Sequence, residues 1–369
     1  MCMEQHEQGG TSSDDPDFCP APPKEPYFDS TRGAWILSRY TDVVAALREK
    51  ALHLSSPKGE TFPDGENEAE RSRQFAQVRA EITLMGTAKW RSDTRSIAHR
   101  VICEAMGKER IDLLGNVTLP WSVAILLALS GATHPYAERI SELAAGLHYK
   151  HSFSTSSPKM RHLIKLLLNR RFPLKYDPET QLDRMLERKE LALSKPMFLA
   201  VSQTLPSFLA KSWLALLRNP AQVFRLRAEP NLIPNAVDEL VRYAGIVHTL
   251  FRKADSDVDV AGIRIARGQL VSLKVASANF DPAKFADPYQ LDVARRPAGQ
   301  LGLGSGLHAC IGAALVRQAF TVLTPLFLNA RPILDHDQRI VWLGESTLRR
   351  PLAVFVNFGG LSESARAET

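Results

Sequence analysis

The feature that most constrains this chain is a glycine-rich loop that carries one cysteine and leads into an apolar-periodic segment. Residues 303–317 read LGSGLHACIGAALVR, with glycines at 304, 306 and 312. Because glycine has no Cβ, such a backbone can turn tightly and approach a flat ligand closely. Cys310 then begins a predicted helix that runs to about Asn329, and a helix N-terminus favours a thiolate, which can bind iron. A lone cysteine is more often a small core residue, so the surrounding loop carries the argument.

This loop resembles the cysteine-ligand loop of the cytochrome P450 family, whose pattern is FGxGxHxCxGxxLAR. Only Leu303 in place of Phe and Val316 in place of Ala depart from it. The resemblance implies the cytochrome P450 fold, haem b (iron protoporphyrin IX) as the cofactor, and Cys310 as the ligand of the iron. It also implies that Leu303, Gly304 and Gly312 lie against the sulfur side of the haem, without the usual aromatic ring at position 303.

A second match lies upstream, in a helix predicted to run from Pro234 to Ala244. Glu239 and Arg242 are three residues apart, which puts both side chains on one helix face. By itself such a pair is most often a solvated ion pair of little energetic value. The resemblance to the family's ExxR helix implies instead a buried pair that is joined by Arg295 and has the structural role of holding the haem loop.

Cations that can pair with the two haem propionates are found in three places. The resemblance aligns Arg252 and His308 with residues that contact propionates in the family. A helix predicted from Arg95 to Met106 offers Arg95 and His99 one turn apart, in the reverse of the family's order. An ordinary amphipathic helix with a basic face would show the same pattern, so both interpretations stay open here.

The segment from Ala200 to Pro206 takes the place of the family's oxygen-activating helix and departs from its pattern. The family carries Ala-Gly-x-(Asp/Glu)-Thr, in which the acid relays protons and the threonine hydroxyl positions water. Here Val201 replaces the glycine and Gln203 replaces the acid, and an amide cannot donate and recover a proton as a carboxylate does. In this alignment Thr204 lies one position before the family's threonine. If the alignment is shifted by one residue, Thr204 takes the place of that threonine. Thr204 and Gln203 are the candidate catalytic residues.

The remaining pattern predicts a mainly α-helical protein with a small β region, in a single domain. Residues 1–26 are polar and rich in proline, which predicts a disordered tail before a haem domain over residues 27–369. Runs at 34–40 and 257–273 predict strands, and Thr41 is the expected N-cap of a helix over residues 42–50. A long helical pattern over residues 180–218 should break or kink at Pro196 and Pro206. The segment from Gly131 to Gln203, which roofs the substrate pocket in the family, is shorter than usual.

The charge of the chain bears on its partners. The net charge is +6, and no dense Lys/Arg block is interleaved with aromatics, which argues against nucleic acid. The resemblance implies a small acidic ferredoxin as electron donor, steered by cations for which Arg95, Arg100, Arg296 and Arg317 are candidates. The lack of a signal-peptide pattern and of a long apolar run predicts a cytoplasmic protein without a membrane partner.

Three functions stay open at this point. The first is a monooxygenase that inserts one oxygen atom into a small-molecule or carrier-bound organic substrate with electrons from the ferredoxin. The second is a peroxide-dependent or redox-neutral haem enzyme, which needs no proton relay; Leu205 and Pro206 match the proline, but not the cation, of the Arg-Pro pair in the family's fatty-acid peroxygenases. The third is a catalytically inactive module that recruits another protein.

Overall fold

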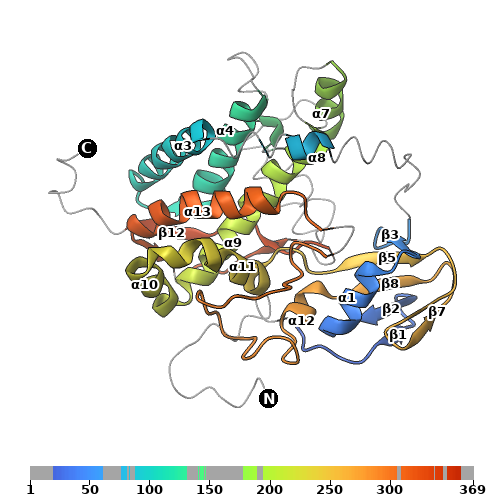
Figure 1. The fold of residues 1–369 in the computed structure, drawn as a ribbon. Coiled ribbons are helices and arrows are strands. Elements are labelled where there is room, and N and C mark those ends of the chain that lie inside the picture. The colour runs from blue at the N-terminus through green and yellow to red at the C-terminus, as the bar shows by residue number, and fades with distance from the viewer. Residues whose placement is uncertain are drawn as a thin grey trace.

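A helical part and a β-rich part lie side by side in the computed structural model (Figure 1). The model describes residues 20–60, 76–80, 83, 88–130, 140, 142–144, 146, 178–188, 194–305, 309–335, 337–343 and 347–358. The helices are α1 (Tyr40–Arg48), α3 (Ala88–Met106), α4 (Leu119–Ser130), α7 (Pro178–Glu187), α8 (Lys195–Leu199), α9 (Leu205–Leu217), α10 (Pro220–Ala228), α11 (Ile233–Ala244), α12 (Val275–Asn279) and α13 (Ala313–Asn329). The prediction of a mainly α protein with a small β region is confirmed. Residues 1–19 of the predicted tail over residues 1–26, and most of the predicted roof segment, lie outside the described residues, so both stay predictions.

Four small sheets make up the β structure of the described residues. The largest has the order β1-β2-β8-β5-β3, and the others pair β4-β12-β9, β10-β11 and β6-β7. The strands are β1 (Tyr27–Asp29), β2 (Ala34–Leu37), β3 (Leu52–Leu54), β4 (Ile111–Asp112), β5 (Leu250–Ala254), β6 (Val258–Val260), β7 (Ile263–Ile265), β8 (Leu270–Leu273), β9 (Pro332–Leu334), β10 (Trp342–Leu343), β11 (Arg350–Pro351) and β12 (Phe355–Phe358). Strand β2 pairs in parallel with β8, so two predicted strands that are far apart in the sequence lie side by side in one sheet.

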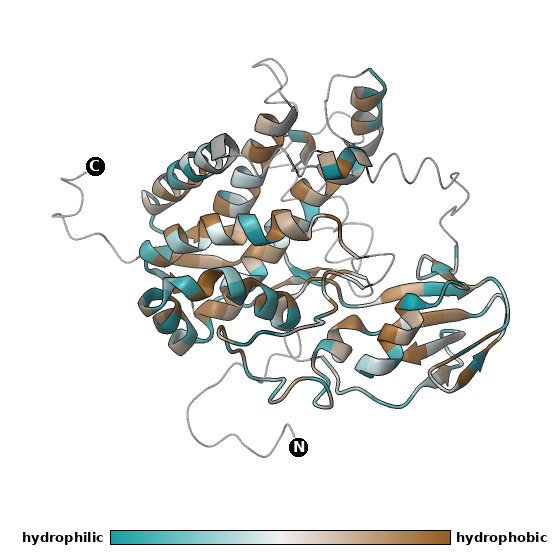
Figure 2. Ribbon diagram, viewed as in Figure 1, coloured by the Kyte–Doolittle hydropathy of each residue, from teal (hydrophilic) through white to brown (hydrophobic). Residues whose placement is uncertain are grey.

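Helix α9 is the central helix of the helical part. Its residues are buried continuously from Leu205 to Leu216, as expected of a helix that is surrounded by other elements on all sides. Trp213 stacks on Phe327 of α13 with ring centroids 4.0 Å apart, and its indole N–H donates to Thr324 Oγ1 at 3.2 Å. Outer helices alternate hydrophilic and hydrophobic residues (Figure 2), which is typical of helices with one buried and one exposed face.

Proline widens the helix ahead of α9 without ending it. Pro206 has no backbone N–H to donate, and residues Ala200–Thr204 form a π-helical turn in which the N–H of Leu205 donates to Ala200 O. A wider turn avoids the clash that a proline ring makes with the carbonyl four residues earlier. Pro196 lies in the first turn of α8, where a missing donor costs little. The predicted kink at Pro206 is therefore a π-helical turn.

Two predicted helix starts were wrong. Helix α1 begins at Tyr40 with Arg39 as the N-cap residue, and not after Thr41. The N–H of Tyr40 donates to Asp281 Oδ2 at 2.8 Å, so a carboxylate from a distant part of the sequence caps this helix. The last helix begins at Ala313 with Gly312 as its N-cap, and Cys310 precedes the helix.

The loop before α13 joins two hydrophobic cores. Leu301 is buried in the core between the large sheet and α1, and Leu303 packs against the core of the helical part. Two positions of this loop that are only two residues apart are therefore held by the β-rich part and by the helical part. Among the described residues, no helix is long and apolar enough to cross a membrane.

Candidate active site

The loop that carries Cys310 is closed by backbone hydrogen bonds. The N–H of Cys310 donates to Leu303 O at 2.6 Å, and the N–H of Gly304 donates to Leu301 O at 2.9 Å. Gly304 has a φ of +74°, a conformation that residues with a Cβ rarely adopt. These bonds present the cysteine at the end of a tight turn. The predicted propionate partner His308 lies outside the described residues.

Cys310 and Thr204 line one apolar cavity of about 230 Å³. Thr204 and Phe208 come from the π-helical turn and from α9, whereas Cys310 comes from the loop before α13. The end of α11, the first residue of β5 and the loop residues Leu303 and Gly304 complete the wall. A slot of this kind, with an apolar wall and a thiol, has the chemistry that a flat, mostly apolar, metal-containing cofactor requires.

The two candidate catalytic residues point in different directions. Thr204 lines the cavity, and its hydroxyl donates to Ala200 O at 2.8 Å. Gln203 is buried and donates through Nε2 to Ala144 O at 3.4 Å and to Ser202 Oγ at 3.2 Å. It is absent from the cavity wall, and within the described part of the chain its Oε1 has no hydrogen-bond partner.

The position of Val201 changes its interpretation. Val201 is fully buried in the hydrophobic core of the helical part and is not among the residues that line the cavity. A valine in place of the family's smaller glycine would be expected to narrow the oxygen-binding side of the pocket. The structure instead places its side chain in the packing around the π-helical turn.

The acidity of the Cys310 thiol differs from the sequence-based expectation. Although Cys310 as a residue is exposed, desolvation by the surrounding protein raises the pKa of its thiol. The backbone N–H of Gly312 and the charge of Arg317 lower that pKa, but less than desolvation raises it. The helix expected to favour the thiolate begins three residues later, at Ala313. The positive charge of a bound metal ion would itself deprotonate the thiol.

Glu239, Arg242 and Arg295 form a buried ion-pair network. The Arg242 guanidinium donates to both Glu239 carboxylate oxygens, each at 2.7 Å, and both side chains are fully buried. Arg295 Nε donates to Glu239 Oε1 at 3.1 Å. Arg242 also donates to the carbonyl oxygens of Asn279 and Pro288, at 2.9 and 2.7 Å. The network therefore connects α11 to α12 and to the irregular segment over residues 281–300, which precedes the loop.

Asn279 extends this network to the loop, a role that the sequence reasoning did not assign. Its Oδ1 accepts a hydrogen bond from the N–H of Leu301 at 2.7 Å, and its backbone carbonyl accepts from Arg242. One residue thus connects the ion pairs to the start of the loop that carries Cys310. The sequence signal that could have pointed to this role is the segment Ala-Asn-Phe-Asp-Pro at residues 278–282, which is similar in order and spacing to a segment of the family.

The predicted propionate partners occupy two different environments. Arg252 is buried in β5, and alternate residues of a strand share a face, so it points to the same side of β5 as the cavity-lining Leu250. Arg95 and His99 are both exposed on α3, and His99 contacts Cys103, with Nδ1 3.6 Å from Sγ. None of Arg252, Arg95 and His99 is among the residues that line the cavity. A buried guanidinium on the cavity side of β5 suits a cofactor carboxylate, so the donor set fits haem.

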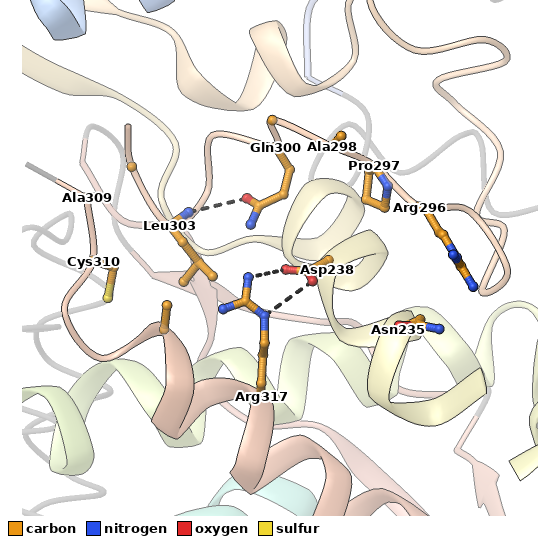
Figure 3. A pocket seen from close by; sticks show the side chains of 13 residues that line it. Asn235, Asp238, Arg296, Pro297, Ala298, Gln300, Leu303, Ala309, Cys310 and Arg317 are labelled. Carbon is orange, nitrogen blue, oxygen red and sulfur yellow. Dashed lines mark hydrogen bonds and ion pairs between the residues drawn. The ribbon is translucent and has the colours of Figure 1, made fainter. Parts of the chain in front are cut away.

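A second cavity, of about 480 Å³, also reaches Cys310 (Figure 3). It is lined by α11, by residues 296–300 and by the first turn of α13. Two of the four candidate steering cations, Arg296 and Arg317, lie here. The other two, Arg95 and Arg100, are exposed on α3. Arg317 forms an ion pair with Asp238 of α11 at 2.7 Å.

The fold and the loop have counterparts in known proteins. The chain matches the family model described as Cytochrome P450 over residues 124–330. It is 24% identical to the "Biotin biosynthesis cytochrome P450" of Bacillus subtilis over 331 residues, which cover 82% of this chain and 84% of that relative. Over 157 residues it is 41% identical to the "Putative cytochrome P450 140" of Mycobacterium tuberculosis, which covers 42% of this chain and 35% of the relative.

Solved structures show the same fold. A structure described under "unusual cytochrome p450-like monooxygenases" of microbial secondary metabolism superposes with a TM-score of 0.74 at 19% identity, covering 95% of this chain and 100% of the other. The structure of P450BioI in complex with an acyl carrier protein that carries hexadec-9Z-enoic acid has a TM-score of 0.66 at 22% identity and covers 88% and 90%. With the loop, the buried network and these matches together, the chain belongs to the cytochrome P450 family of haem-thiolate monooxygenases.

Proposed function

We propose that this protein uses haem b to insert one oxygen atom into a small organic substrate, with electrons from a small acidic ferredoxin. The observation that carries the proposal is that Cys310 and Thr204 line the same apolar cavity from two different elements. One element brings the ligand for the iron, and the other brings a hydroxyl for handling water near the iron. A monooxygenase that activates dioxygen would use both at the same cofactor.

The cofactor would be held by residues at its centre and at its edge. Cys310 would bind the iron, with Leu303, Gly304 and Gly312 around the sulfur. Arg252 would pair with a propionate, and His308, Arg95 and His99 are the further propionate partners of the proposal. When bound, haem-thiolate iron supplies the dioxygen and one-electron chemistry.

Thr204 is the residue proposed to handle protons in the cavity. Because its hydroxyl proton is directed to Ala200 O, its oxygen lone pairs are free to accept a hydrogen bond from water in the cavity. The hydroxyl can therefore hold a water molecule. When the bond to Ala200 O breaks, it can donate its own proton and take a replacement from that water. The π-helical turn supports this role, since it leaves Thr204 on the cavity side.

Gln203 would act on position and not on proton transfer. Its amide donates to Ala144 O, outside the cavity wall. At neutral pH an amide neither takes up nor releases a proton, so it cannot act as an acid or a base. We propose that it fixes the π-helical turn against the segment that contains Ala144. The catalytic role proposed for this pair of residues then belongs to Thr204 alone.

The substrate is proposed to be largely apolar and either free or attached to a carrier. The described cavity wall is mostly apolar, with Phe208, Val247 and Leu250 among its members. One comparison supports the carrier-bound form, because the structure of P450BioI is in complex with an acyl carrier protein that carries a fatty acid. The ferredoxin would dock on the face where Arg296 lies and the second cavity opens.

A reduced sample with carbon monoxide tests the haem-thiolate part of the proposal. We expect the red-shifted Soret band of a thiolate-bound haem in the purified protein and its loss in Cys310→Ser. Cys103→Ser is the matched control, because Cys103 is an exposed cysteine on α3 that does not line the cavity. Absence of the band in the unchanged protein would refute the proposal.

Product formation under two conditions tests the reaction. We expect product and oxygen consumption with ferredoxin, its reductase and NADPH, and less product when hydrogen peroxide replaces them. Product with peroxide alone would favour a peroxide-dependent enzyme. A thiolate band without product under either condition, with a panel of fatty acids free and carrier-bound, would favour the inactive recruitment module.

A further inference from the structure

An ion pair lies in the second cavity, which Cys310 also lines. Arg317, on the first turns of α13, donates through Nη2 to Asp238 Oδ1 at 2.7 Å and through Nε to Asp238 Oδ2 at 3.2 Å (Figure 3). Both side chains and Cys310 belong to the wall of this cavity. The pair is partly exposed, with 43% of the Arg317 side chain and 30% of the Asp238 side chain accessible.

The carboxylate of this pair is held in place by the rigid part of the site. Asp238 precedes Glu239 in α11, and neighbours in a helix point about 100° apart. Glu239 therefore faces the buried network with Arg242, whereas Asp238 faces the cavity. Because the network fixes α11, the backbone of Asp238 is held where its carboxylate can reach Arg317 of α13.

The charge of Arg317 reaches the sulfur of Cys310. Arg317 and Cys310 line the same cavity, and Arg317 lies in the helix that begins three residues after Cys310. Its positive charge therefore favours negative charge on the sulfur. The Asp238 carboxylate, in bidentate contact with the guanidinium, offsets much of that positive field. The net field at the sulfur therefore depends on both members of the pair.

We infer that the Asp238–Arg317 ion pair sets the electron-donating strength of Cys310, and that Asp238 thereby keeps the reduction potential of the bound haem low. Asp238 is a positioning residue here, since it acts through Arg317 and does not line the cavity that Cys310 shares with Thr204. The inference rests on the proposed function, because it concerns the haem that Cys310 would bind. Uncompensated positive charge near the ligand favours the reduced iron, which carries one more electron.

Three substitutions test this inference. Two should shift the reduction potential of the haem in opposite directions, and the third should leave it nearly unchanged. Asp238→Asn leaves Arg317 uncompensated, and at the wild-type midpoint potential the ratio of reduced to oxidised haem should rise roughly three- to tenfold. Arg317→Gln leaves the carboxylate and should lower that ratio by a similar factor. Asp238→Glu keeps the charge and should stay within about twofold of wild type.

Spectroelectrochemical titration of the substrate-free holoprotein measures these shifts, and it requires no turnover. Asp335→Asn is the matched control, because it breaks another Asp–Arg pair, with Arg110 at 2.8 Å, whose members line neither cavity. It changes the net charge by the same amount and should leave the potential unchanged. The double variant Asp238→Asn/Arg317→Gln should return towards wild type.

The outcomes separate this inference from the proposed function. A thiolate-type carbon monoxide band with equal potentials in wild type and Asp238→Asn overturns the inference and leaves the proposed function intact. An equal shift in Asp335→Asn also overturns it, since net charge alone would then be the cause. If Asp238→Asn does not retain haem, the sign of the Arg317→Gln shift decides. Absence of the band in the wild type overturns both.

Discussion

The two sides of the candidate haem site are built differently. On the sulfur side, Arg242 is fully buried and its donors reach Glu239 and three carbonyl oxygens. On the opposite, oxygen-handling side, a π-helical turn interrupts the helix, Thr204 has a bond to Ala200 O, and Gln203 Oε1 is buried without a hydrogen-bond partner in the described structure.

This difference shows how stability and reactivity are divided in the molecule. A buried charge is tolerated only when every donor and acceptor around it is satisfied, and the sulfur side meets that condition with several long-range contacts. A π-helical turn and an unsatisfied polar atom cost stability, and such features occur often at functional sites. We therefore expect substitutions on the sulfur side to change folding, and those on the oxygen side to change turnover.

The largest effect is expected for Glu239→Gln. The substitution leaves Arg242 and Arg295 without their charged partner in the interior, and loss of one member of a buried ion pair costs about 3–5 kcal/mol. Denaturant unfolding of the holoprotein measures the change. Glu229→Gln is the control, because Glu229 is half exposed and pairs with Arg225 on the surface, where about 1 kcal/mol or less is expected. Equal losses in both variants would contradict the comparison.

A somewhat smaller effect is expected from pH at His248, in the segment between α11 and β5. Burial and the charges of Lys211 and Lys274 lower the pKa of His248 from 6.5 to about 4. Between these values the unfolded chain binds a proton that the folded protein does not. The contribution of neutral His248 to the free energy of unfolding is therefore fully present above pH 6.5. It falls by about 3 kcal/mol as the pH is lowered to 4.

The pH dependence of the free energy of unfolding tests this point when wild type is compared with His248→Gln. The variant has no group that titrates at this position, so its curve should be flatter between pH 6.5 and 4. Identical slopes for the two proteins would show that His248 keeps an ordinary pKa in the fold.

Thr204→Val should reduce product formed per electron consumed about tenfold, the size of one lost hydrogen-bonding group in proton handling. The stability should change little, since valine keeps the shape of threonine in a position that is only half-buried. Thr204→Ser keeps the hydroxyl and should retain most of the coupling. The measurement is the ratio of product to NADPH oxidised, and unchanged coupling in the valine variant would remove Thr204 from the mechanism.

The smallest effect is expected for Gln203→Met. It removes an unsatisfied buried oxygen together with a long hydrogen bond to Ala144 O and one to Ser202 Oγ. These losses and gains oppose each other, so the free energy of unfolding should change by less than about 1 kcal/mol. Turnover should stay within about twofold of wild type, because the side chain does not line the cavity. A strong loss of coupling here, with Thr204→Val unaffected, would reverse the assignment of the two residues.

Several features of the fold could be predicted from local sequence signals. The strand at 34–37, the helix predicted from Pro234 to Ala244 and the strands at 258–273 follow from alternation and from proline positions. Helix boundaries that depend on distant residues could not be predicted in this way. The start of α1 depends on a carboxylate 241 positions away, and α13 starts after the cysteine because the preceding turn is fixed by Leu303 O.

The sequence by itself pointed to Cys310 as the candidate ligand and determined the charged partners and the order of elements, because glycine, cysteine and the ExxR spacing act through local backbone geometry and side-chain chemistry. Only the tertiary structure decided that Thr204 and not Gln203 lines the cavity, that Asn279 connects the ion pairs to the cysteine loop, and that Asp238 pairs with Arg317. The reason is physical: a π-helical turn rotates the side chains around it, and the other two contacts join segments that are brought together only by packing of the two cores.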